Sequence, residues 1–129
     1  MSEESVRESF ARQAFMNTIG ARLARVAPGE VDIELDFRQD LTQQSGTLHA
    51  GVISAIADSA CGYAALSLMP EVSNVVSVEF KLNLLAPATT SILARARVLR
   101  AGRTLTVTSA DVLAGGTLIA TMLATMMRR

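Results

Sequence analysis

Asp58 is the residue of this 129-residue chain whose surroundings best suit chemistry. It is the only charged residue between Asp40 and Glu71, and it lies in an apolar, small-residue stretch from Leu48 to Pro70. A carboxylate seldom enters such surroundings unless it is paired, hydrogen-bonded or used in a reaction. The only histidine, His49, precedes it by nine residues. Because a carboxylate can act as a general base or as a nucleophile, this segment is the first candidate for a site.

Ala50 and Gly51, the small residues after His49, fit the start of a helix, where backbone amides have no partner. Such amides, aided by the helix dipole, can polarise a carbonyl group, and a nearby carboxylate then favours attack of water on an acyl carbon. On one helix, the nine residues from His49 to Asp58 correspond to about half a turn beyond two full turns and to ~13 Å of rise. The two side chains therefore point to opposite sides. If both serve one active site, a second subunit must supply one of them.

Each of these residues also has a purely structural interpretation. A buried aspartate can accept structural hydrogen bonds, His49 can be a cap or a packing residue, and Ala50 and Gly51 can simply let a helix pack closely on a sheet. Cys61 is best interpreted as a small core residue, because it lies twelve positions from His49. One histidine and one cysteine are too few for a metal site of the usual type, and no glycine-rich phosphate loop is present. We therefore expect neither a metal nor a cofactor.

Length and charge narrow the function classes. A chain of 129 residues predicts a single domain over residues 1–129. The 12 basic and 12 acidic residues cancel, which argues against nucleic acid as a partner. The hydrophobic fraction of 50% is high, and we interpret the excess as a subunit interface of a homo-oligomer.

The sequence also favours a cytoplasmic protein. A single cysteine cannot form an intrachain disulfide, and the acidic start over residues 2–5 lacks the pattern of a signal peptide. The apolar stretch from Leu48 is long enough for a membrane span, but Asp58 at its centre would cost about 3 kcal/mol in lipid. We therefore predict a buried helix and no membrane span.

The spacing of apolar residues predicts mostly strands around one long helix. The strict alternation from Glu30 to Phe37 is typical of a half-exposed antiparallel strand. The helix over residues 48–68 is apolar on every side, so we expect it to be covered on every side. The other expected elements are a helix over residues 5–16 and strands over 21–26, 75–85, 91–99, 104–113 and 118–127. A sheet must bury one face, so we expect an α+β domain in which the sheet curls round the long helix.

The segment 43–51 followed by 58–65 resembles the hotdog-fold acyl-CoA thioesterases of the phenylacetate-pathway (PaaI-like) type. That family shows a Gly-x-x-His-Gly-Gly stretch with an acid nine residues past the histidine, and here Gly46, His49 and Asp58 keep these places. The likeness continues through residues 76–80, 85–88 and 102–105, in the family's order, and covers nearly the whole chain from Phe15 onward. Ala50 departs from the pattern, because the family has a glycine there. Its methyl group leaves the N–H donor intact but puts the size of the substrate in question.

The resemblance implies a hotdog fold, with a central helix wrapped by an antiparallel sheet of about six strands. It implies dimers that join their sheets edge to edge, and often tetramers. It also implies hydrolysis of an acyl-CoA to a free carboxylic acid and CoA, with the coenzyme as part of the substrate. Asp58 would be the base or nucleophile, the backbone N–H of Ala50 would polarise the carbonyl, and Gly51 would allow close approach.

Further site residues follow from the same resemblance. Gln43 matches a position with a polar side chain near the carbonyl, Ser77 matches a hydroxyl that helps to place the attacking water, and His49 would orient the loop and the substrate. The family shares its site between two subunits, in agreement with the spacing of His49 and Asp58. Arg100 and Arg103 are candidates for the phosphates of the coenzyme, with solvated turn residues as the alternative.

Two other functions remain as alternatives. A non-catalytic hotdog module would bind acyl-CoA or a partner without turning it over, and it would lose nothing on the substitution Asp58→Asn. A hotdog hydratase or dehydratase uses a histidine with a separate acid in differently spaced motifs, and this pattern disfavours it. The acyl group, aliphatic or aryl, and the choice between dimer and tetramer stay open.

Overall fold

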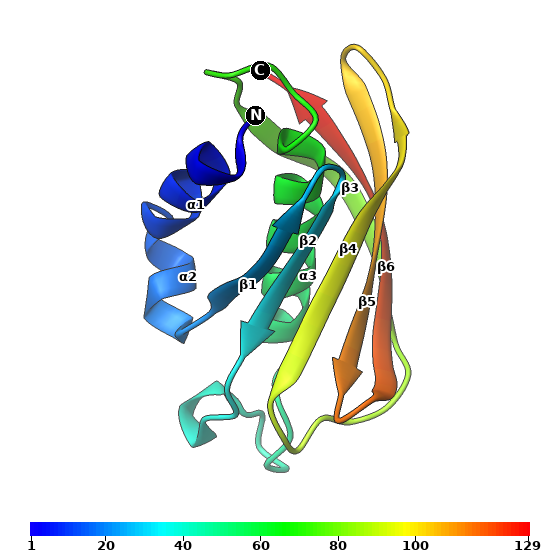
Figure 1. Ribbon diagram of the computed structural model, residues 1–129. Helices are drawn as coiled ribbons and strands as arrows, with labels where there is room; N and C mark the ends of the chain where they lie inside the picture. Colours follow the sequence, from blue (N-terminus) through cyan, green and yellow to red (C-terminus); the bar gives the residue numbers. More distant parts are fainter.

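The computed structural model describes residues 1–129, and its architecture is one long helix held in a curved sheet (Figure 1). The helices are α1 (Glu3–Ala11), α2 (Ala14–Ile19) and α3 (Ala50–Leu66), with a short 3-10 helix η1 (Gln39–Leu41). The strands are β1 (Arg22–Ala27), β2 (Glu30–Leu35), β3 (Val75–Leu84), β4 (Ile92–Ala101), β5 (Leu105–Ala114) and β6 (Thr117–Arg128). Each predicted strand is confirmed, with ends that differ by two residues at most.

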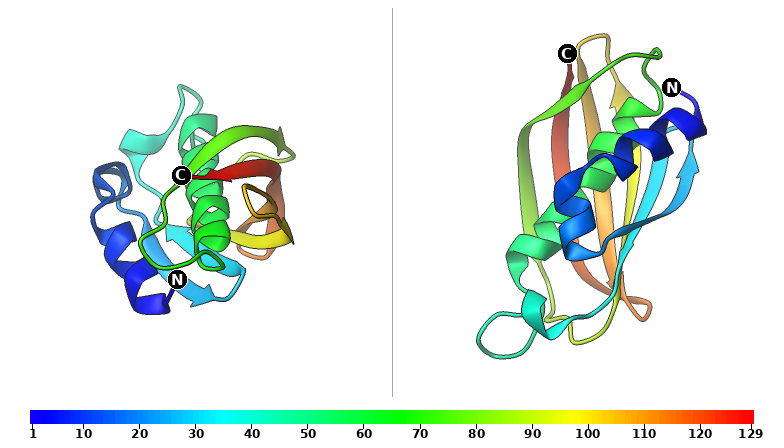
Figure 2. Two further views of the ribbon diagram at one scale, coloured as in Figure 1. Left: turned by 90° about the horizontal axis from the view of Figure 1, so that it is seen from above. Right: turned by 90° about the vertical axis from the view of Figure 1, so that its left-hand side faces the viewer.

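All six strands form one antiparallel sheet in the order β1-β2-β4-β5-β6-β3. Seen from above, the sheet curves round α3, while α1 and α2 lie on the side away from β5 and β6 (Figure 2). The two edges of the sheet are β1 and β3. The predicted α+β hotdog fold, a long central helix wrapped by a curved antiparallel sheet of six strands, is confirmed.

Small side chains on the inner face of the sheet let α3 approach closely. Ala96 of β4 pairs with Ala110 of β5, and both are buried together with Ala94. Ile56 and Ala60 of α3 are completely buried in the same core. Burial of one large apolar side chain contributes about 1.5–3 kcal/mol, so this contact supplies a large part of the stability of the fold.

The single helix expected over residues 5–16 is wrong, because the structure has two helices there. The chain leaves the helical conformation at Gln13, which has φ −79° and ψ 98°. Phe10 and Met16 are both buried, and six residues at ~100° each would place them on different sides of one continuous helix. The break turns Met16 back towards the core, and the side chain of Asn17 caps α1 by donating to the carbonyl oxygen of Ala11.

Within one chain, the long helix is not covered on every side. One stripe of α3 is left open, with Gly51 exposed and Ala55, Asp58 and Gly62 only half-buried. The sheet and α1 cover the other sides, where the helix carries its larger apolar residues. By length and composition alone residues 50–67 could cross a membrane, yet 61% of this segment is buried inside the fold.

Cys61 provides a test of how tightly α3 is held. Its side chain is completely buried, and burial raises the pKa of the Cys61 thiol to about 12. Since the thiolate is the reactive form, we expect no reaction of the native protein with a thiol reagent such as DTNB at about pH 8. In denaturant the same reagent should label one thiol per chain, which serves as the control. Rapid labelling of the native protein would contradict this packing.

Candidate active site

Asp58 and Ser77 are brought together by the packing of β3 beside α3. The Ser77 hydroxyl donates a hydrogen bond to Oδ1 of Asp58 at 2.6 Å, and its oxygen lies 3.4 Å from the sulfur of Met126. The register of β3 against β6 shifts between Ser77 and Glu79, so a bulge follows Ser77 directly. Such a bulge re-aims a side chain at a strand position and is common next to active sites. The structure therefore places these two predicted site residues in direct contact.

A pocket of about 230 Å³ adjoins the Asp58–Ser77 pair. Its wall is built by α1, the Gln13 cap of α2, α3, the start of β3, and Met126 of β6. The remaining lining residues are Ser9, Ser59, Gly62, Tyr63, Leu66, Asn74 and Val75. The carboxylate of Asp58 is half-buried here, at the open stripe of α3, and remains accessible to a bound molecule.

The start of α3 is organised by His49. This residue is the N-cap of the helix, and its Nδ1 accepts the backbone N–H of Gly51 at 2.7 Å. In the neutral imidazole the other nitrogen, Nε2, then carries the proton. A Cβ atom on residue 51 would come within 2.9 Å of Nδ1, so the glycine leaves the room that the imidazole occupies. The N–H of Ala50, in contrast, donates to no acceptor within the chain and stays free for a ligand.

Gln43 lies beside this helix start. Its Nε2 donates to the hydroxyl of Thr47 at 2.7 Å, and its Oε1 accepts the backbone N–H of Ser45. Gln43, Thr47 and Ala50 line a second pocket of about 330 Å³, together with Leu48, Ile53, Leu84, Leu85, Ala86 and Pro87. This pocket therefore adjoins the end of β3, whereas the pocket of Asp58 adjoins its beginning.

The predicted site residues thus fall into two groups within one chain. Asp58 and Ser77 line one pocket, Gln43 and Ala50 line the other, and no hydrogen bond joins His49 to Asp58. Arg100 and Arg103 lie exposed at the end of β4 and in the turn to β5, and they line neither pocket. A role of these arginines towards the coenzyme stays a prediction.

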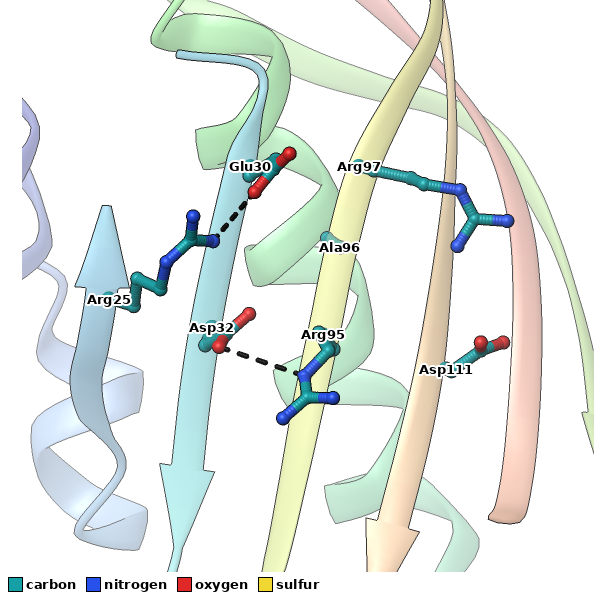
Figure 3. Close-up of a pocket in the computed structure, with 7 residues that line it drawn as sticks. All are labelled: Arg25, Glu30, Asp32, Arg95, Ala96, Arg97 and Asp111. Carbon is teal, nitrogen blue, oxygen red and sulfur yellow. Dashed lines mark hydrogen bonds and ion pairs between the residues drawn. The ribbon is translucent and has the colours of Figure 1, made fainter. Parts of the chain in front are cut away.

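A separate charged cluster lies on the face of the sheet away from α3 (Figure 3). Arg25 pairs with Glu30 at 2.7 Å, and Arg95 lies 3.8 Å from Asp32. Burial raises the pKa of Asp32, and the nearby charges of Arg95 and Arg25 act against this shift. The cluster sets exposed arginines around Asp32, which is buried and whose Oδ1 has no hydrogen-bond partner, and it lies apart from the Asp58 pocket. Across the whole chain, no three His, Cys, Asp or Glu side chains gather closely enough to hold a metal ion.

Comparison with known proteins assigns the family. Residues 45–120 match the model of the thioesterase superfamily, so the chain belongs to this superfamily. A thioesterase family protein of Silicibacter pomeroyi is 49% identical, with a TM-score of 0.92 over 97% of this chain and 96% of that one.

Two further solved structures are similar. The phenylacetic acid degradation protein PaaI of Thermus thermophilus, solved as a mutant, is 27% identical, with a TM-score of 0.84 over 91% of this chain and 100% of that one. The conserved protein PA5202 of Pseudomonas aeruginosa shares the fold at 24% identity, with a TM-score of 0.90 and full coverage of both chains. The predicted resemblance to the hotdog thioesterases is confirmed.

Several pocket residues were not identified from the sequence. Thr47 holds the side chain of Gln43, and Ser9, Gln13 and Tyr63 line the pocket beside Asp58. Thr47 lies inside the motif, between Gly46 and His49, where its hydroxyl could have been noticed. Ser9 and Gln13 carry no local signal, because only the packing of α1 and α2 brings them to α3.

His49 gives a prediction on the helix start. Replacement by Asn keeps a short side-chain acceptor that is favoured at an N-cap, whereas Ala removes the acceptor from the N–H of Gly51. We expect His49→Ala to lower the free energy of unfolding by about 0.5–2 kcal/mol, and His49→Asn to recover most of this loss. Urea titrations followed by circular dichroism measure both. Equal stability of the two variants would show that the cap contributes nothing.

Proposed function

We propose that the protein hydrolyses acyl-CoA thioesters to a free carboxylic acid and CoA, with Asp58 as the catalytic base or nucleophile. The observation that carries this proposal is the 2.6 Å hydrogen bond from Ser77 to Asp58 at a pocket of a thioesterase-superfamily fold. The hydroxyl occupies Oδ1 of the carboxylate. The second oxygen, Oδ2, is therefore left to take a proton from water or to attack the acyl carbon itself.

In the water route, the oxygen of water forms a bond to the thioester carbon while its proton passes to Oδ2 of Asp58. The carbonyl oxygen gains the negative charge, and the C–S bond then breaks. The thiolate of CoA leaves and takes up a proton, so the products are the free acid and the thiol. Ser77 holds the carboxylate in one orientation through the whole sequence, which fixes the direction from which it accepts the proton.

The free N–H of Ala50 suits the developing oxyanion. It points from the first turn of α3, where the helix dipole adds positive potential, and it has no competing acceptor in the chain. Gln43, fixed by Thr47 in the same pocket, adds a polar side chain beside it. In this proposal Ala50 and Gln43 polarise the carbonyl, and His49 orients them by capping the helix.

We infer that each site is shared between two subunits, which join through β3. This strand is an edge of the sheet, and Val78 and Phe80 on it are 53% and 44% exposed. An exposed, apolar edge strand is suited to pair with a second copy. In an antiparallel pair related by a two-fold axis, the start of one β3 lies opposite the end of the other. Ser77 of one chain then approaches Leu84 of the partner subunit.

This pairing supports a complete site. The pocket with Asp58 adjoins the start of β3, and the pocket with Gln43 and Ala50 adjoins its end. Antiparallel contact of two β3 strands brings the first pocket of one subunit to the second pocket of the other. The proposal therefore includes at least a homodimer. A buried, unpaired Cys61 also suits a reducing compartment such as the cytoplasm.

Asp58→Asn tests the catalytic assignment. The amide keeps an oxygen that can accept the hydrogen bond from Ser77, but it cannot take up a proton or form an acyl bond. We expect kcat for acyl-CoA hydrolysis to fall by about 10²–10⁴-fold, with the fold and the oligomeric state retained. Release of free thiol from a panel of acyl-CoAs measures this, and Asp40→Asn on the surface is the matched control.

The opposite result is equally informative. If the wild-type protein binds acyl-CoA but releases no thiol, or if Asp58→Asn hydrolyses as well as wild type, the catalytic proposal is wrong. Binding without turnover would favour the non-catalytic hotdog module.

Ala50→Pro tests the oxyanion donor. Proline is well tolerated at the first position of a helix, and the preceding His49 has an extended conformation (φ −66°, ψ 139°) that suits it. The substitution replaces the amide hydrogen by the Cδ atom of the ring, which cannot donate a hydrogen bond, so we expect kcat to fall by about 10²–10³-fold at nearly unchanged stability. Ala50→Ser, which keeps the N–H, is the control.

Mixed oligomers test the sharing of the site. Asp58→Asn and Ala50→Pro chains, co-expressed with different tags and purified as mixed dimers, carry one intact Asp58 and one intact Ala50 on different subunits. A shared site predicts recovery of up to about half of the wild-type activity, because one of two sites per dimer is then complete. Activity no higher than that of either parent variant would place the whole site within one chain.

A further inference from the structure

The pocket beside Asp58 contains polar groups for which the proposed hydrolysis has no use. The hydroxyls of Ser9 and Tyr63 lie 3.2 Å apart on its wall, at the side formed by α1. One hydrogen bond between two hydroxyls consumes a single O–H group. The other O–H group and several lone pairs are left for a bound molecule.

Tyr63 is held rigidly. Its side chain is only 7% exposed, and its ring packs edge-on against Phe10 with centroids 5.8 Å apart. Burial raises the pKa of the Tyr63 hydroxyl, so this group stays neutral and can donate as well as accept. A fixed, neutral hydroxyl in a pocket wall discriminates between ligands that can and cannot pair with it.

Gln13 offers a second unused group. Its Oε1 accepts a hydrogen bond from Ser59 at 3.3 Å, and its Nε2 donates to no atom of the chain. Ser59 follows Asp58 directly, so this amide stands close to the reacting end of the pocket. At ~1.5 Å of rise per residue, Tyr63 lies about 8 Å further along α3 than Asp58. The amide of Gln13 therefore lies in the part of the pocket near Asp58, and the hydroxyl of Tyr63 lies in the part far from it.

Size and charge restrict what the pocket can hold. Its volume of about 230 Å³ lies below the roughly 300–1,000 Å³ typical of small-molecule pockets, which suits a short acyl group. Asp58 is the only charged residue on the wall, and no lysine or arginine lines it. An acyl group that ends in a carboxylate would find no basic side chain on the wall to pair with, since Arg12, whose charge acts on the Tyr63 hydroxyl, lies outside the lining.

We propose that this pocket is the acyl subsite, and that it selects short, uncharged acyl groups with a hydroxyl at the far end. Tyr63 and Ser9 bind that hydroxyl, and Gln13 binds nearer to the thioester, so that these three residues determine specificity. This inference rests on the proposed thioesterase function.

Three acyl-CoAs of equal carbon number test the subsite: hexanoyl-, 6-hydroxyhexanoyl- and adipyl-CoA, which end in a methyl, a hydroxyl and a carboxylate. We expect kcat/KM to be roughly three- to tenfold higher for the hydroxylated substrate than for hexanoyl-CoA, as one net hydrogen bond implies. Adipyl-CoA should be the poorest of the three. Dodecanoyl-CoA, included as a probe of length, should be poorer than hexanoyl-CoA.

Variants assign the preference to residues. Tyr63→Phe keeps the ring against Phe10 and should bring the ratio of the hydroxylated substrate to hexanoyl-CoA close to one, by lowering only the former. Ser9→Ala should act in the same direction. Gln13→Ala should instead raise KM for both substrates, since its amide lies near the part that they share. Ser5→Ala, one turn earlier on α1, is the matched control and should change neither value.

The failures of the two proposals can be told apart. No hydrolysis of any of these esters by wild type overturns the thioesterase function and the subsite with it. Hydrolysis without preference for the hydroxylated substrate, or a preference that survives in folded Tyr63→Phe and Ser9→Ala, overturns the subsite alone. Thermal unfolding of each variant establishes that it is folded.

Discussion

The confinement of α3 inside a curled sheet is the constraint on which the rest of this structure depends. The helix must be apolar where the sheet touches it, and the inner face of the sheet must be lined with small residues such as Ala96 and Ala110 for the strands to close round it. This six-stranded sheet is open, with β1 and β3 at its edges, so it does not surround the helix completely. The side that stays open is where a carboxylate can be carried without burial in the core, and Asp58 lies there.

The same constraint explains why the site is divided. The start and the middle of α3 offer different chemistry: a free N–H group at its first residue and a carboxylate two turns later. A rigid helix cannot bend to bring them together, since eight residues span ~12 Å. Strand β3 runs along the open side and supplies a hydroxyl to one of them. A second copy that pairs with the exposed edge of β3 can bring its own N–H group close to the carboxylate of the first chain.

Much of the fold was predictable because its signals are local. Strand periodicity over residues such as Glu30 to Leu35 depends only on neighbours in the sequence, and Pro70 and paired glycines mark the turns. The break at Gln13 was not predictable, since it serves to bury Phe10 and Met16 against the rest of the core. The open stripe on α3 was missed for a similar reason. A hydropathy pattern reports what a helix can bury, and only the assembled sheet decides what is covered.

The candidate site was predictable to a lesser degree. Spacing along α3 placed His49 and Asp58 apart, and the assignment of Ser77 to the site followed from the resemblance, not from any pattern in β3. Residues that reach the pocket from α1, such as Ser9, had no signal at all. Their position depends on how α1 packs on α3, and that packing is determined by contacts between residues that are far apart in the sequence.

The close approach of the His49 imidazole to Gly51 also bears on how this helix start can evolve. A side chain at position 51 is excluded only as long as position 49 holds a ring that folds back over it. The two positions are therefore epistatic: a change at one alters which residues the other tolerates, and their mutational effects will not add. A lineage that replaced the histidine by a smaller cap would be released from the glycine as well, so the histidine should change before the glycine and not after it.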